Sequence, residues 1–172
     1  MLPWPTMARS HLDHVDRIRE QWQRERPDVD TAALGLVGRL HRAALLTNTP
    51  LAAGLAEQGL QPGWFDLLAA LRRSGRPYEL NPTQLMRATL LSSGGMTKRL
   101  DRLVQAGLVE RRADPVDRRG VLVSLTRHGK EVVDSALDAH VANEERLLRP
   151  LSSGDRRTLD DLLRKLLVGL ET

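Results

Sequence analysis

Side chains that could hydrogen-bond to DNA recur on one side of the segment Ser92–Leu103. A buried helical stripe is predicted by Met96, Leu100 and Leu103, which stand at positions i, i+4 and i+7. At about 100° per residue, the residues that point away from this stripe are Gly94, Lys98, Arg102 and Gln105. A helix with a short, basic outer face is what contact with the DNA major groove requires. The segment is therefore a candidate recognition helix.

A shorter helix is predicted immediately before this one. The run Asn81–Gln84 supplies a cap, a proline at the first helical position and a glutamine that completes a capping box. Leu85 and Ala88 should face inward. Ser92 can cap the candidate recognition helix, and Gly107 supplies its C-terminal stop. The pattern is that of a helix-turn-helix.

Two segments after the helix pair alternate like β-strands, Leu108–Arg112 and Gly120–Leu125. Between them lies the polar turn Ala113–Arg119, with Arg118 and Arg119 near its tip. Two helices followed by a basic hairpin make a winged helix-turn-helix. The expected fold is therefore mainly α (α+β).

The wing and its exit resemble those of MarR-type transcriptional regulators. The resemblance is carried by the run DPVDRR at Asp114–Arg119 and the run LTRHG at Leu125–Gly129, and it extends from about Asp30 to the C-terminus. It implies a transcriptional regulator that binds double-stranded DNA. We expect Lys98 and Arg102 to serve the major groove. The full set of expected DNA-binding residues is Ser92, Ser93, Gly94, Thr97, Lys98, Arg102, Arg118 and Arg119.

Composition agrees with this interpretation. The chain has 172 residues and a net charge of +4, and residues 76–128 carry 10 Lys and Arg against 5 Asp and Glu. The positive excess coincides with the winged-helix segment, as phosphate neutralisation would need, although charge is more often a merely solvated surface. The chain contains no cysteine, which excludes disulfides, thiol redox sensing and Cys-based zinc sites. No signal peptide or membrane span is predicted, so a cytoplasmic protein is expected.

The remaining helices are predicted outside the winged segment. They cover residues 11–26, a segment after Asp28 or Asp30 that Thr49–Pro50 bends or interrupts, residues 64–73, a long helix capped by Thr126, and a last helix capped by Ser152 or Ser153. The last helix carries a wide apolar stripe, made of Leu159, Leu162, Leu163, Leu166, Leu167 and Leu170. Such helices at both chain ends favour homodimerisation over ordinary core packing, and a homodimer suits a pseudo-palindromic operator. We divide the chain into N-terminal scaffold helices at 1–60, the winged domain at 61–126 and C-terminal dimerisation helices at 127–172.

An enzyme is not predicted. The sequence has no nucleophile elbow, Walker loop, dinucleotide-binding glycine pattern or His-Glu-x-x-His pair. His11 and His14 are spaced i, i+3, but a solvated pair is favoured over a metal site. No cofactor is expected. The alternative to a ligand-controlled regulator is a winged-helix module for DNA architecture or protein contacts, without a small-molecule switch.

The additional N-terminal helix resembles that of the urate-responsive branch of the MarR family. Residue by residue, the ligand positions of that branch fall on Trp22, Asp66, Arg99 and Arg111. The resemblance therefore implies a repressor that a small anion such as urate releases from DNA. Two alternatives stay open. Asp66 could form a structural salt bridge with Arg99 or Arg111, and Trp22 could be a core residue.

Overall fold

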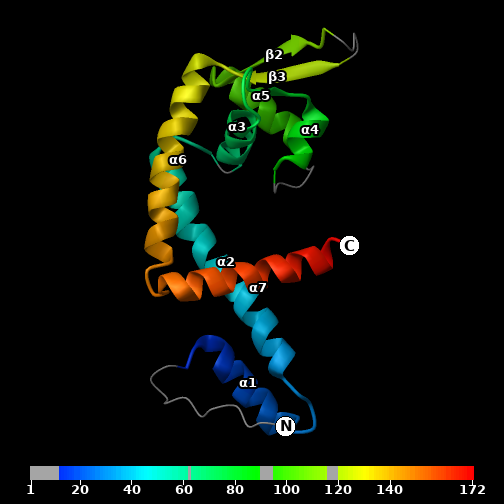
Figure 1. Ribbon diagram of the computed structural model, residues 1–172, viewed down its shortest axis with the longest axis vertical. Coiled ribbons are helices and arrows are strands. Elements are labelled where there is room, and N and C mark those ends of the chain that lie inside the picture. The colour runs from blue at the N-terminus through cyan, green and yellow to red at the C-terminus, as the bar shows by residue number, and fades with distance from the viewer. Residues whose placement is uncertain (1–11, 62, 90–94, 116–119) are drawn as a thin grey trace. The chain divides into compact units, whose positions relative to one another are not determined.

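The structure is a computed structural model, and it describes residues 12–61, 63–89, 95–115 and 120–172. The described chain is mainly helical with one small antiparallel sheet, as the sequence predicted (Figure 1). In chain order the elements are α1 (His14–Glu25), α2 (Ala32–Glu57), α3 (Trp64–Arg73), β1 (Glu79–Leu80), α4 (Pro82–Arg87), α5 (Met96–Gln105), β2 (Val109–Ala113), β3 (Val121–Leu125), α6 (Arg127–Leu147) and α7 (Ser153–Leu170).

The chain forms two compact units, Met1–Thr49 and Pro50–Thr172. In the first unit, Asp13 caps α1 through a capping box with Asp16. Arg39 of α2 reaches both carboxylates, with Nε 2.8 Å from Asp13 and Nη2 2.6 Å from Asp16. These ion pairs join α1 to α2 around the buried side chain of Val15. The three-part division proposed from the sequence stays a prediction.

Helix α2 continues through Pro50 to Glu57. Of the two effects predicted for Thr49–Pro50, an interruption is therefore wrong, and a bend stays a prediction. Proline removes one backbone donor from a helix, but the helix survives where packing compensates for that loss. The carbonyl of Pro50 accepts a 2.8 Å hydrogen bond from the buried amide of Asn143 on α6. Pro50 and Asn143 both belong to the second unit, and this bond holds the part of α2 that follows Thr49 against α6.

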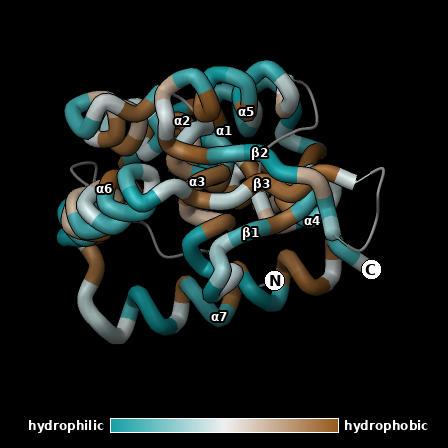
Figure 2. The backbone as a smooth tube through the Cα atoms, turned by 90° about the horizontal axis from the view of Figure 1, so that it is seen from above, coloured by the Kyte–Doolittle hydropathy of each residue, from teal (hydrophilic) through white to brown (hydrophobic). Residues whose placement is uncertain are grey.

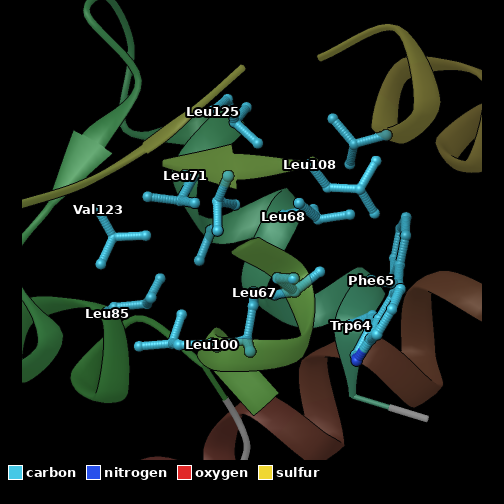
Figure 3. Packing of buried hydrophobic residues seen from close by; sticks show 14 of the residues in the cluster. Trp64, Phe65, Leu67, Leu68, Leu71, Leu85, Leu100, Leu108, Val123 and Leu125 are labelled. Carbon is cyan, nitrogen blue, oxygen red and sulfur yellow. The ribbon is translucent and has the colours of Figure 1, made fainter. Parts of the chain in front are cut away.

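The core of the second unit is built around α3. This helix buries Trp64, Phe65, Leu67, Leu68, Ala70 and Leu71. The predicted stripe of α5 is confirmed, because Met96, Leu100 and Leu103 are all buried in the same cluster. Leu85 of α4 and Val123 of β3 are fully enclosed there as well (Figure 3). Ala88 packs against the cluster. Complete burial of one such side chain contributes about 1.5–3 kcal/mol, so the cluster fixes how these elements meet.

The wing is a three-stranded sheet in the order β1-β3-β2, and β1 was not foreseen. Two residues are too few to show the alternation by which strands are recognised in a sequence. In the register, Val109 pairs with Leu125 and Arg111 pairs with Val123. These residues therefore share the face of the sheet that contributes to the core, because side chains of a strand alternate between faces.

Most predicted helix ends are confirmed. Asn81 and Gln84 form the expected capping box of α4, and Thr126 caps α6. Gly107 adopts the expected left-handed conformation after α5, at φ 68°. The N-cap of α5, however, is Gly95 rather than Ser92, and its φ of 81° is a conformation that favours glycine.

Helix α7 buries none of its side chains within the described chain. A capping box between Ser152 and Asp155 starts it, and none of its residues is buried. Leu162 is 61% exposed and Leu170 is 72% exposed. Hydrophobic stretches alternate with hydrophilic ones along this helix in Figure 2. None of its apolar residues is buried within the described chain, and the role of this helix in a dimer stays a prediction. No helix within the described ranges is both long and apolar enough to cross a membrane.

The joint between α6 and β2 should tolerate no side chain at Gly129. A β-carbon at this position would lie 1.8 Å from the backbone oxygen of Leu108, so the backbone itself would have to move. We expect Gly129→Ala to lower the free energy of unfolding by about 1–3 kcal/mol or more, measured by urea denaturation. Gly154→Ala on α7 is the matched control, since its β-carbon would meet only Ser152 Oγ at 3.7 Å. Equal stability of the two variants would contradict the packing described.

Candidate nucleic-acid interface

The outward face of α5 carries the candidate DNA-reading side chains. Lys98, Arg102 and Gln105 are exposed, as the helical period predicted, and Thr97 beside them is exposed as well. The buried stripe on the opposite side leaves the helix no other orientation, so burial of leucine positions the basic residues. Arg102 Nη1 lies 3.4 Å from Gln61 Oε1, a long contact that leaves the guanidinium accessible. This face therefore presents two cations and two neutral hydrogen-bonding groups to solvent.

Five of the predicted DNA-binding residues lie outside the described residues: Ser92, Ser93, Gly94, Arg118 and Arg119. Their assignments stay predictions. The strands that lead to the wing tip are described on both sides, and Asp114 N donates to the carbonyl of Gly120 at 3.0 Å. The hairpin is thus closed beneath its tip.

Two adjacent arginines at the base of the wing have different partners. Arg111 Nη1 lies 2.6 Å from Asp101 Oδ1 on α5, so an ion pair joins the wing to the candidate recognition helix. Arg112 lies on the other face of the sheet and donates through Nε and Nη2 to Glu79 of β1, at 3.1 and 2.6 Å. The sequence analysis did not identify Asp101 or Glu79. Strand alternation separates Arg111 from Arg112, but only the fold shows which carboxylate each one meets.

The predicted ligand residues are spread over both units. Asp66 is half-buried in the first turn of α3, Arg99 is partly buried on α5, and Arg111 lies at the start of the wing. The suggested salt bridge between Asp66 and Arg111 is wrong, because Arg111 pairs with Asp101. Asp66 forms no ion pair with any described residue, Arg99 included. Trp22 belongs to the first unit and is 47% exposed, so it is not a core residue there.

A cavity of about 540 Å³ lies between α3 and α6, and the sequence analysis did not anticipate it. Its apolar wall includes Phe65, against which His140 stacks with a centroid distance of 4.7 Å. At its charged edge, Asp134 accepts hydrogen bonds of 2.7 Å from both Lys130 and Arg72. The hydrogen bond from Lys130 has the largest effect on the pKa of Asp134 and that from Arg72 the next largest. Both lower this pKa, which keeps the carboxylate ionised.

Known proteins are similar to this chain in sequence and in fold. The model of the MarR family matches residues 58–120. The chain is 38% identical over 149 residues to the HTH-type transcriptional regulator PecS of Dickeya dadantii, covering 87% of this chain and 90% of PecS. It is 32% identical over 108 residues to the multiple antibiotic resistance protein MarR of Salmonella typhimurium, covering 60% and 70% of the two chains.

Solved structures agree with these matches. A cysteine-to-serine mutant of MarR from E. coli, complexed with operator DNA, is similar with a TM-score of 0.70 and 29% identity, covering 81% of this chain and 99% of that one. Sco3205, a MarR family transcriptional regulator from Streptomyces coelicolor in complex with DNA, has a TM-score of 0.72 and 28% identity, covering 83% and 94%. The family consists of transcriptional regulators and not of enzymes. With its fold, its basic outer helix face and these relatives, the chain belongs to the MarR family of DNA-binding transcriptional regulators.

Proposed function

We propose that this regulator is a sequence-specific repressor that a small anion releases from its operator. The observation that carries the proposal is the outer face of α5, where Lys98, Arg102 and Gln105 are exposed beside a fully apolar inner stripe. Side chains in this position can read base edges from the major groove, while lysine and arginine also neutralise phosphates. Since its target is chromosomal DNA, we expect it to act in the cytoplasm.

We further propose that the regulator binds DNA as a homodimer. Support comes from exposed apolar residues on α7, and from Leu36, Leu45 and Leu46 on α2 in the other unit, all more than half exposed. Exposed apolar surface of this extent marks interaction sites in proteins that work in water. A second copy of the chain is the partner that a two-fold symmetric operator would require.

Removal of a basic side chain from the outer face of α5 should weaken DNA binding in one of two measurable ways. If Lys98 contacts a phosphate, Lys98→Ala should reduce the salt dependence of binding by about one unit and weaken all sequences equally. If Arg102 contacts a base edge, Arg102→Ala should cost about 1–3 kcal/mol and relax the preference at one position. Both can be measured by fluorescence anisotropy against a duplex selected from a random pool, with a scrambled duplex for comparison.

The control for these variants is Arg157→Ala, which removes the same charge from the exposed polar face of α7. It should leave the affinity for the selected duplex and the sequence preference unchanged. If all three variants bind alike, α5 is not the recognition helix.

A dimer fixes the geometry of the operator. Two recognition helices must enter successive major grooves on one side of the duplex, so half-site centres should lie about 34–36 Å apart, or one helical turn. Insertion of five base pairs between half-sites rotates them to opposite sides and should abolish tight binding, while insertion of a full turn has no such rotation. Light scattering should give a dimer at micromolar concentration. A monomer with undiminished affinity for the selected duplex would contradict the proposal.

The ligand proposal rests on the resemblance of Trp22, Asp66, Arg99 and Arg111 to the urate-responsive branch. Arginine pairs suit a flat anion, because a guanidinium can donate two parallel hydrogen bonds to it. An anion brought close to Asp66 would repel that carboxylate. Arg99 lies on α5 and Arg111 on β2, so a ligand that holds both pulls on the two elements that contact DNA. Coupling of this kind typically changes affinity by about five- to 150-fold.

Titration of the protein–duplex complex with urate tests this proposal. Wild-type protein should release DNA, and Asp66→Asn should release less DNA at equal urate occupancy, because the neutral amide no longer repels the anion. Arg99→Ala should bind urate more weakly. A useful control is Asp138→Asn, an exposed residue of α6 that should behave like wild type. Undiminished release in both Asp66→Asn and Arg99→Ala would rule this site out. Absence of any release by small anions would favour the ligand-independent module.

A further inference from the structure

We propose that Asp101 is a positioning residue that holds Arg111 in the DNA-reading arrangement, and that a bound anion competes with Asp101 for this arginine. The proposal rests on the proposed ligand site and deepens it, since it names what a ligand must displace. We name the ion pair Asp101–Arg111 the latch. It connects the middle of α5 to the middle of β2.

Strand register explains why Arg111, and not Arg112, reaches the recognition helix. Arg111 pairs with Val123 and follows Val109 by two residues, and both valines are buried. It therefore emerges on the face of the sheet that packs on the core, and α5 contacts β2 there. Arg112 emerges on the opposite face and is held by Glu79 of β1. The two arginines cannot exchange partners without a slip of the register.

Helix geometry explains why the latch and a ligand exclude each other. Asp101 and Arg99 are two residues apart on α5, which places them about 160° apart around the helix axis. The guanidinium of Arg99 lies toward the start of the helix, since a β-carbon at Gly95 would be 3.6 Å from its Nη1. While Asp101 holds Arg111 at 2.6 Å, Arg111 is directed to the flank of α5 away from Arg99. An anion clasped by both arginines must therefore open the latch.

The latch is weak enough to be opened. The Arg111 side chain is 35% exposed and the Asp101 side chain is 47% exposed, so water competes for both charges. Ion pairs of this kind change equilibria by about two- to fivefold. Arg112 is held more firmly, because two of its nitrogens, Nε and Nη2, donate to the carboxylate of Glu79. The Glu79 carboxylate is also more buried than that of Asp101. The pair Arg112–Glu79 can keep β2 on the sheet when Arg111 leaves. Opening the latch would thus free α5 from the wing without unfolding the wing.

The test combines Asp101→Asn and Arg111→Gln in a double-mutant cycle, with Glu131→Gln as the control. The control removes the same charge and breaks an exposed ion pair with Arg127 on α6. The measured quantity is the duplex ratio, the affinity for the selected duplex divided by the affinity for a scrambled duplex. Loss of a negative charge raises the affinity for any DNA, and this general effect cancels in the ratio. Each single latch variant should lower this ratio about two- to fivefold, and the double variant should lower it no further. Glu131→Gln should not change it.

A second measurement titrates the same proteins with urate in the absence of DNA. Asp101→Asn should bind urate about two- to fivefold more tightly than wild type, because the competing carboxylate is gone. A merely structural role for Asp101 would not raise the affinity for an anion.

The outcomes separate the latch from the proposed function. Additive effects on the duplex ratio would overturn the latch, whether or not urate binds. Non-additive effects with unchanged urate affinity in Asp101→Asn would overturn the competition. Non-additive effects with no urate binding to any variant would support the latch as a positioning contact and reject urate as its ligand.

Discussion

Burial of one short stripe on α5 is the constraint on which the DNA-reading surface depends. Met96, Leu100 and Leu103 enter the core cluster around α3, and no rotation of α5 can bury them and also hide Lys98. The basic face is therefore positioned by leucine and methionine rather than by its own contacts. Burial of one leucine side chain stabilises the fold by about 1.5–3 kcal/mol, whereas an exposed ion pair contributes at most about 1 kcal/mol. Apolar packing therefore decides the orientation of α5.

A second constraint connects the wing to the helix that follows it. Gly129 lets the first turn of α6 approach the backbone of Leu108, and Thr126 Oγ1 donates to the carbonyl of Gly107 at 2.7 Å. The start of β2 and the start of α6 are thus packed directly against each other and form a joint. Because α6 also contacts α3, and Asn143 of α6 donates to Pro50 of α2, this joint connects the wing to the other helices of the second unit.

The polar pairs around the wing contribute position more than stability. The pairs Asp101–Arg111 and Glu79–Arg112 are both partly exposed, so solvent reduces their free energy, but each one selects a single partner for a long and flexible side chain. That selectivity is what a regulator can use. A contact that stabilises the fold strongly could not be opened by a metabolite, whereas a half-exposed pair can be exchanged for another anion.

Elements with a strong hydrophobic period or a distinctive cap could be predicted from the sequence alone. The stripe of α5, the capping box at Asn81, the Thr126 cap and the hairpin strands all depend on residues close together in the chain, where local physics decides. The outward direction of Lys98 and Arg102 follows from the same local period. The apolar stripe of α7 could be predicted in the same way, although only the structure shows that none of its residues is buried by the described chain.

Tertiary structure alone decided what depends on distant residues. Strand β1 forms because β3 supplies its hydrogen bonds. The end of α2 is held against α6 because Asn143 donates to the carbonyl of Pro50. Arg111 pairs with Asp101 because the sheet packs beside α5. From the sequence, a salt bridge of Asp66 with either Arg99 or Arg111 was one open alternative, reasonable by charge alone. The charges in a sequence show which groups can attract each other. The actual partner of a long side chain is the group that packing brings within its reach.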